Sequence, residues 1–148
     1  MTETRITDPS TGGQKGDKPR RYDLIPPDVL GELADHYGAG VSKYPNPDPQ
    51  WPGQANWQRG YAWHLCLAAL LRHLMAWAEG EDVDEETGSN HLIAVAWHAF
   101  ALRWFQLHGA GTDDIAGRQH ARILSDIAQI PSNNTAVYRE IMENVNCG

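Results

Sequence analysis

The sequence predicts an all-α protein, a helical bundle built on a central antiparallel helical hairpin. Residues 61–79 and 91–108 are apolar nearly all round a helical turn, which is typical of buried helices. A short acidic stretch separates them, so the second segment is expected to return along the first. No useful length of chain alternates apolar and polar residues as a strand does. We therefore expect one domain over residues 21–148, preceded by a flexible arm over residues 1–20.

The N-terminal arm is rich in Gly, Thr, Lys and Asp and has no apolar periodicity. Such a segment cannot bury enough apolar surface to fold alone, so we expect it to be mobile in the free protein. Its end is basic, with Lys15, Lys18, Arg20 and Arg21 close together. Cations of this kind bind phosphate groups.

The first predicted helix follows two prolines. Pro26 and Pro27 impose an extended entry and then permit a helix to start, and Asp28 favours that start through the helix dipole. An apolar stripe supports the prediction, made of Leu30, Leu33, Ala34 and Tyr37. Gly38 and Gly40 are expected to end this helix.

A proline-rich segment, residues 41–56, comes next and predicts an irregular loop. It leads into Asn56, Trp57 and Arg59. A tryptophan beside polar side chains suits stacking on a nucleobase. The alternative, equally open from the sequence, is that Trp57 fills a place in the core.

We expect the two central helices to form the inner pair of the bundle. Arg72 and His73 interrupt the first one, and charged or polar groups inside a buried helix are paired or used. Ser89 or Asn90 can cap the second one.

Beyond the hairpin, two glycines break the chain and Thr112 is expected to cap a third long helix. Asp113 and Asp114 would lie in its first turn. Pro131 would stop this helix, and Thr135 would cap a last short one.

Carboxylates are dense between the central helices, at Glu79, Glu81, Asp82, Asp84, Glu85 and Glu86. His73 precedes this acidic loop, and His91 and His98 follow it. His98 is seven residues after His91 and shares its helix face. In an antiparallel hairpin, His73 then falls at a height between the other two. This arrangement predicts a metal and acid–base centre. The alternative is a solvated turn beside histidines that serve the core.

Composition restricts the function classes. A net charge of −7 with neutral histidines disfavours non-specific binding to nucleic acid. Cys66 and Cys147 are too few for a disulfide framework or a zinc knuckle. The N-terminus has no apolar signal-peptide core, and no apolar run approaches the roughly 20 residues that span a membrane. We therefore expect a cytoplasmic protein that contacts neither membrane nor nucleic acid.

Three pieces of sequence, in this order, resemble a known family: GGQKGDKPRRYDLIPPDVLGELADHYGAGVSKY, NWQRGYAW and RHLMAWAEGEDVDEETGSNHLIAVAW. The resemblance is to the N-terminal-type dATP/dGTP diphosphohydrolase domain common in phage genomes. That family looks like a divergent relative of the MazG-type all-α nucleoside triphosphate pyrophosphohydrolases. The match covers roughly residues 13–105.

The resemblance implies an activity. A deoxynucleoside triphosphate, with a purine preferred, would be cut between its α and β phosphates with Mg²⁺ or Mn²⁺. MazG enzymes hold their metal with an ExxE helix and an ExxD helix, where this chain has His73 and Ala76, then His91 and Ala94. The two-helix carboxylate cage is therefore not carried over residue by residue.

The residues of this chain still offer the chemistry. We expect Glu81, Asp84 and Glu86 to supply hard oxygen ligands to the metal, with His73 adding nitrogen. His73 or His91 would act as general base, and Arg72 would stabilise developing charge. The remaining predicted substrate contacts are Lys15, Lys18, Arg21 and Lys43 to phosphates, and Asn56, Trp57 and Arg59 to the base.

Two other functions stay open. The altered cage suits a protein that captures a nucleotide or nucleotide-derived signal without cutting it. An HD-type phosphohydrolase fits less well, because His73 is followed by Leu74 and not by aspartate. In either case we expect a homo-oligomer, a dimer or tetramer, because two helices that are apolar nearly all round need a partner subunit to cover them.

Overall fold

The computed structural model describes residues 4–46 and 55–129 of the chain. Within them lie two strands, two 3₁₀ turns and four α-helices, so the predicted all-α class is confirmed. In chain order the elements are β1 (Thr4–Thr7), β2 (Gln14–Asp17), η1 (Tyr22–Leu24), α1 (Pro27–Lys43), η2 (Asn56–Arg59), α2 (Trp63–Ala78), α3 (His91–His108) and α4 (Ala116–Ala128).

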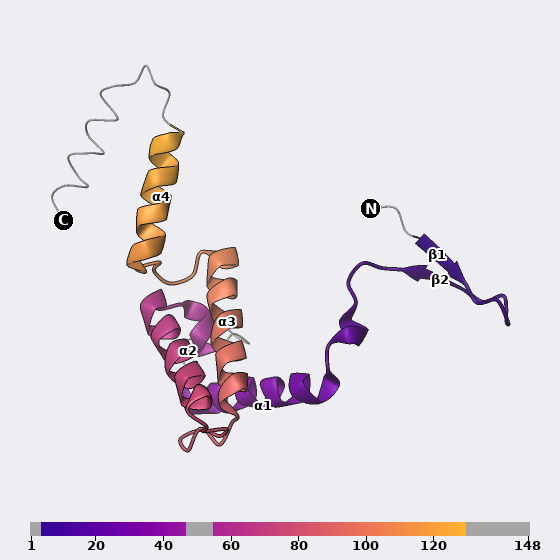
Figure 1. Cartoon of the computed structure of the whole chain (residues 1–148), viewed down its shortest axis with the longest axis horizontal. Helices are drawn as coiled ribbons and strands as arrows, with labels where there is room; N and C mark the ends of the chain where they lie inside the picture. Colours follow the sequence, from indigo (N-terminus) through magenta and orange to yellow (C-terminus); the bar gives the residue numbers. More distant parts are fainter. Residues whose placement is uncertain (1–3, 47–54, 130–148) are drawn as a thin grey trace.

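Helices α2 and α3 run antiparallel side by side, and α1 lies across one end of the pair (Figure 1). The side chains buried between these helices are Leu33, Trp63, Cys66, Ile93, Ala94, Ala101 and Phe105. Most of them come from α3, which therefore forms the centre of the core. The alanines, both fully buried, let the neighbouring helices approach α3 closely.

Helix α1 is longer than the sequence predicts, because it continues through Gly38 and Gly40 to Lys43. A glycine inside a helix costs roughly 1 kcal/mol relative to alanine. Packing of α1 against α3 offsets that cost: the ring of Tyr37 lies 5.9 Å from the ring of Trp97. The prediction that the glycines end the helix is therefore wrong.

The N-terminal arm contains an antiparallel hairpin where the sequence predicts no regular structure. Strand β1 pairs with β2 from Thr4 opposite Asp17 to Thr7 opposite Gln14. At the turn, the Asp8 carboxylate accepts hydrogen bonds from the backbone and hydroxyl of Ser10 and the backbone of Thr11. These bonds lower the pKa of Asp8 to about 2. Alternation is missing from the sequence because β1 is exposed along its whole length and faces no core.

Two glycines permit a tight crossing of distant segments, residues 60–64 and 110–114. Gly60 has a positive φ of 77°, and a Cβ placed on it would lie 2.1 Å from the backbone nitrogen of Gly111. The backbone N–H of Trp63 donates to Thr112, and that of Thr112 donates to Tyr61. The crossing fixes the start of α2 against the end of α3.

The crossing also explains why Thr112 does not cap α4, which begins at Ala116 with Ile115 at its N-cap. Asp114 instead accepts a hydrogen bond from the backbone of His64, in the first turn of α2. Asp113 lies beside Arg118 and Arg122 of α4. The helix predicted after Pro131, and Cys147, lie outside the described residues.

The prediction that no helix spans a membrane agrees with the structure: within the described ranges, none is long and apolar enough to do so.

Candidate metal centre

The acidic loop between α2 and α3 has a defined fold. The backbone N–H of Glu81 donates to Ala76, that of His91 donates to Asp82, and Val83 and Asn90 form an antiparallel bridge. The side chain of Asn90 accepts from the backbone of Leu92, so the predicted cap of α3 is confirmed for this residue. The backbone of the loop is therefore held by hydrogen bonds at both ends, while most of its carboxylates are exposed.

His73 of α2, Asp84 of the loop and His91 of α3 come together at this end of the hairpin. Each offers one ligand atom, and the three atoms lie within 4.8 Å of one another. The Nδ1 atoms of the two histidines are 2.9 Å apart. The ring of His73 lies 5.2 Å from that of His91 and 5.7 Å from that of His98, so its predicted height between them is confirmed.

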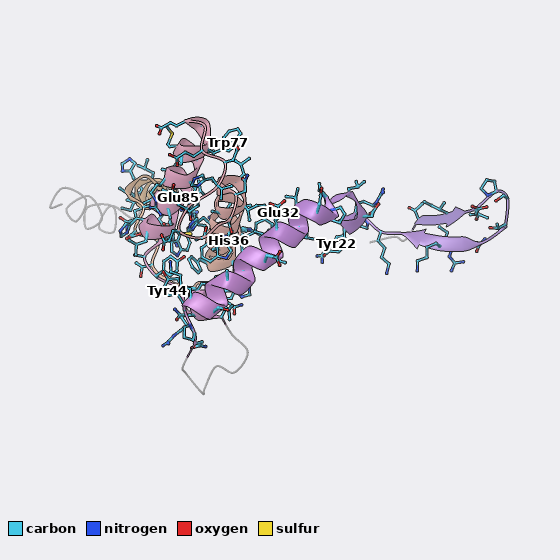
Figure 2. The ribbon with its side chains drawn as sticks, turned by 90° about the horizontal axis from the view of Figure 1, so that it is seen from below. Tyr22, Glu32, His36, Tyr44, Trp77 and Glu85 are labelled. Carbon is cyan, nitrogen blue, oxygen red and sulfur yellow. The ribbon has the colours of Figure 1, made fainter. Side chains whose placement is uncertain are left out.

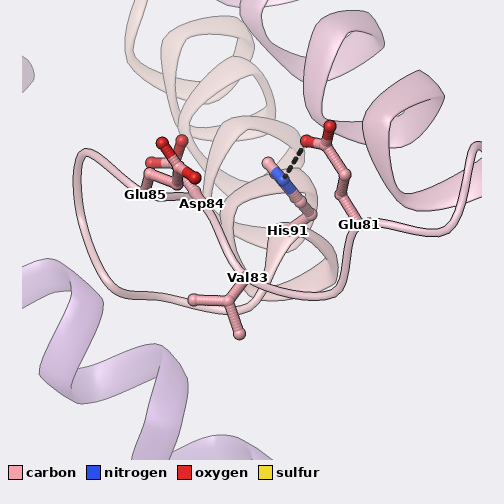
Figure 3. Close-up of a pocket in the computed structure, with 5 residues that line it drawn as sticks. All are labelled: Glu81, Val83, Asp84, Glu85 and His91. Atoms are coloured by element: carbon pink, nitrogen blue, oxygen red, sulfur yellow. Dashed lines mark ion pairs between the residues drawn. The ribbon is translucent and has the colours of Figure 1, made fainter.

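His91 carries an unsatisfied buried atom. The residue is only 4% exposed, and its Nε2 has no hydrogen-bond partner. Buried polar atoms are nearly always paired, so an exception of this kind calls for an explanation. The nearest charged group is the Glu81 carboxylate, with Oε2 3.7 Å from Nε2 (Figure 3).

The carboxylate indicates which ring nitrogen of His91 carries the proton. Between the two facing Nδ1 atoms, one must donate and the other accept. A proton on His91 Nε2 faces the Glu81 carboxylate favourably, whereas a lone pair there would face a negative charge. The Nδ1 atom of His91 then carries a lone pair directed at His73. This lone pair can accept a proton from His73 or bind a metal ion between the two rings.

The protonation states of the other two residues also suit a metal. Burial lowers the pKa of His73, against the opposing charge of Asp84. The pKa of Asp84 is lowered mainly by the hydroxyl of Thr87, which donates to its Oδ2 at 2.6 Å. A neutral imidazole and an ionised carboxylate are the forms that bind metal.

Two further histidines support the group. The His98 ring stacks on His73, its Nδ1 lies 3.2 Å from the Cys66 sulfur, and burial lowers its pKa to about 4. His36 arrives from α1, and its Nδ1 lies 2.8 Å from the hydroxyl of Ser89. Burial lowers the pKa of His36 as well. Its place three residues after the buried Leu33, on the same helix face, was the available signal that sequence reasoning missed.

A hollow of about 480 Å³ opens beside the group, lined by Glu81, Val83, Asp84, Glu85 and His91 (Figure 3). Its size lies in the range of small-molecule sites. Polar and acidic side chains line it, which favours a cation or a metal-bound ligand over a bare anion.

Comparison with known protein families gives a match. A family model described as "dATP/dGTP diphosphohydrolase, N-terminal" matches residues 9–115. The chain belongs to this family. No curated protein and no solved structure matches the chain.

The dATP/dGTP diphosphohydrolase family match includes every residue of the metal group and its supporting histidines. It extends from the turn of the N-terminal hairpin to the crossing, and α4 lies beyond it. The family name implies a hydrolase, in agreement with the resemblance found in the sequence.

Other predicted site residues of this family member are not among the three residues of the metal group. The Glu86 carboxylate pairs with Lys43 at the end of α1. Arg72 is exposed, and its charge acts on both His73 and His98. Lys15, Lys18 and Arg21 lie on the exposed arm, where Arg21 pairs with Asp23 at 2.6 Å.

Trp57 packs against the bundle. Its ring lies 5.7 Å from Tyr37, 6.0 Å from Trp97 and 5.2 Å from Trp104. It holds η2 against α1 and α3 and is half-buried there. Its stacking on a base stays a prediction. Asn56 and Arg59 flank it on the same turn. Their contact with a base stays a prediction.

Proposed function

We propose that the chain is a metal-dependent pyrophosphohydrolase that cuts purine deoxynucleoside triphosphates to monophosphate and pyrophosphate. The observation that carries the proposal is the group of His73, Asp84 and His91, with the unsatisfied buried nitrogen of His91 behind it. The family description supplies the substrate class.

The donor set fits a divalent ion and favours Mn²⁺ over Mg²⁺. Magnesium prefers an octahedron of oxygen atoms, whereas imidazole suits transition metals. His73, Asp84 and His91 would hold the ion. A bound ion would neutralise phosphate charge and activate a water molecule.

Protein residues around the ion would orient and transfer protons. The Glu81 carboxylate, 3.7 Å from His91 Nε2, favours a proton on that nitrogen and so leaves Nδ1 free to hold the ion. With both imidazoles used as ligands, proton acceptance from the attacking water passes to a carboxylate of the hollow, Glu81 or Glu85. Arg72 remains the predicted cation for developing charge.

The test is incubation with each of the four dNTPs and either Mn²⁺ or Mg²⁺, with release of pyrophosphate measured. We expect turnover of dATP and dGTP, faster with Mn²⁺, and its loss in Asp84→Asn and His91→Gln. Matched controls are Asp82→Asn, an exposed carboxylate of the same loop, and His108→Gln, at the far end of α3. Wild-type turnover in both ligand variants would overturn the proposal.

A binding protein that does not cut its ligand is the second candidate. Ala94, which stands where the related cage has a carboxylate, is fully buried, so only one carboxylate belongs to the metal group. Intact dNTP recovered from a stable complex, with no pyrophosphate released under any metal, would favour this candidate.

A further inference from the structure

The N-terminal arm and the acidic loop are complementary in charge but lie at opposite ends of α1. The described arm and linker, residues 4–25 and called the arm below, carry Arg5, Lys15, Lys18, Arg20 and Arg21 against Asp8, Asp17 and Asp23. The acidic loop has the opposite charge. The stretch from residue 79 to residue 102 begins with the six carboxylates of the loop and contains no lysine or arginine.

The arm points away from its own loop. Figure 2 shows α1 leaving the bundle and the strands continuing beyond Tyr22, far from the labelled Glu85. The loop contacts Lys43 at the C-terminal end of α1. The arm begins before Pro27 at the other end, about 25 Å away for 17 residues at 1.5 Å each.

The arm also exposes apolar surface that needs a cover. Tyr22 is 70% exposed and Leu24 is 68% exposed, and Ile25 beside them is exposed as well. An isolated two-stranded hairpin is marginally stable in water unless it packs against something. Such contiguous apolar surface beside a basic segment is typical of a docking element.

A matching surface lies beside the acidic loop. The last two turns of α2 expose Leu71, Leu74, Met75 and Trp77, directly before the first carboxylate at Glu79. The arm thus presents basic and then apolar residues, and the hairpin end presents apolar and then acidic ones. His91, with its buried and unpaired Nε2, lines the hollow beside this surface.

We propose that the arm of one chain docks on the α2 end and acidic loop of a second copy, and that two copies exchange arms about a two-fold axis. A second copy is favoured over nucleic acid because the chain as a whole is acidic. Docking brings Lys15 and Lys18 to the rim of the partner's hollow, where they meet the phosphates of the substrate. This last part rests on the proposed function, whereas the docking does not.

The test is a charge exchange read by light scattering, without nucleotide or metal. The arm-reversed variant carries Lys15→Glu and Lys18→Glu, and the loop-reversed variant carries Asp82→Lys and Glu85→Lys. We expect the wild type to show twice the chain mass of 16.5 kDa and each variant alone to show the single mass. An equal mixture should return to the double mass, because each reversed arm then meets a reversed loop.

The matched control is Glu32→Lys with Asp35→Lys, two exposed carboxylates of α1 outside the loop, which should keep the double mass. A monomeric wild type, a variant that stays dimeric alone, a mixture that stays monomeric, or a control that dissociates would each overturn the inference. None of these masses depends on turnover. The proposed function can therefore be contradicted while the arm exchange is confirmed, and the arm exchange can be contradicted while the proposed function is confirmed.

Discussion

Two places in this molecule join distant segments through a histidine and an aspartate, and they differ in how completely their polar groups are satisfied. At the crossing, Asp114 accepts from the backbone of His64 and pairs with its ring, while the indole N–H of Trp63 donates to Ala110 at 2.9 Å. At the metal group, His91 keeps a buried Nε2 without a partner.

This difference in hydrogen bonding distinguishes a cluster that stabilises the fold from one that serves a function. A polar network whose members are all paired stabilises a fold, and nothing needs to be added to it. A buried nitrogen left unpaired beside a neutral imidazole and an ionised carboxylate costs stability in the free protein, typically about 1–3 kcal/mol. An unpaired buried group of this kind is typical of a functional site and not of a purely structural network.

Breaking the crossing should have the largest effect. Gly60→Ala and Gly111→Ala each place a Cβ about 2 Å from backbone atoms at a positive φ. We expect each to lower the free energy of unfolding by at least about 3 kcal/mol, seen in urea denaturation. Gly117→Ala is the control, because α4 has open space at that position and should gain slightly. Variants within about 1 kcal/mol of wild type would show that the crossing is not tight.

Binding of Mn²⁺ to the metal group should have the next largest effect on stability. Mn²⁺ at a hundred times its Kd should stabilise the chain by about 2.7 kcal/mol, measured as a rise in Tm, and a chelator should reverse it. Asp84→Asn should remove the rise, and Asp82→Asn should keep it. An equal rise in both variants would place the ion elsewhere.

Removing the unsatisfied nitrogen of His91 should abolish metal binding with little effect on the stability of the metal-free protein. His91→Met removes the unpaired Nε2 together with the Nδ1 contact to His73. Because these two effects oppose each other, the metal-free Tm should stay within an amount worth about 1 kcal/mol of the wild type. The response to Mn²⁺ should vanish. A large drop in the metal-free Tm would mean that His91 serves the fold, as the alternative reading of the sequence has it.

The smallest effect is expected at Glu86. Its carboxylate is exposed and paired with Lys43 at the surface, and such pairs contribute little. Glu86→Gln should therefore leave both the Tm and the response to Mn²⁺ unchanged. A lost metal response would restore Glu86 as the ligand that the sequence predicts.

Features that depend on local patterns could be predicted from the amino-acid sequence. The central helices were predicted at residues 61–79 and 91–108 and are found at Trp63–Ala78 and His91–His108. Apolar periodicity, the Asn90 cap and helical spacing also placed His73 between His91 and His98. Each of these depends on residues within a few turns of one another, so a single segment contains the information.

Only the tertiary structure decided which side chains meet across distance. It brought His36 from α1 to the loop, paired Glu86 with Lys43, and placed Trp57 among the rings of Tyr37 and Trp97. Packing on α3 carried α1 through two glycines, and the crossing drew Thr112 away from the start of α4. These outcomes depend on the free energy of contacts between segments that are up to about fifty residues apart, and local propensity of about 1 kcal/mol or less is too weak to oppose them.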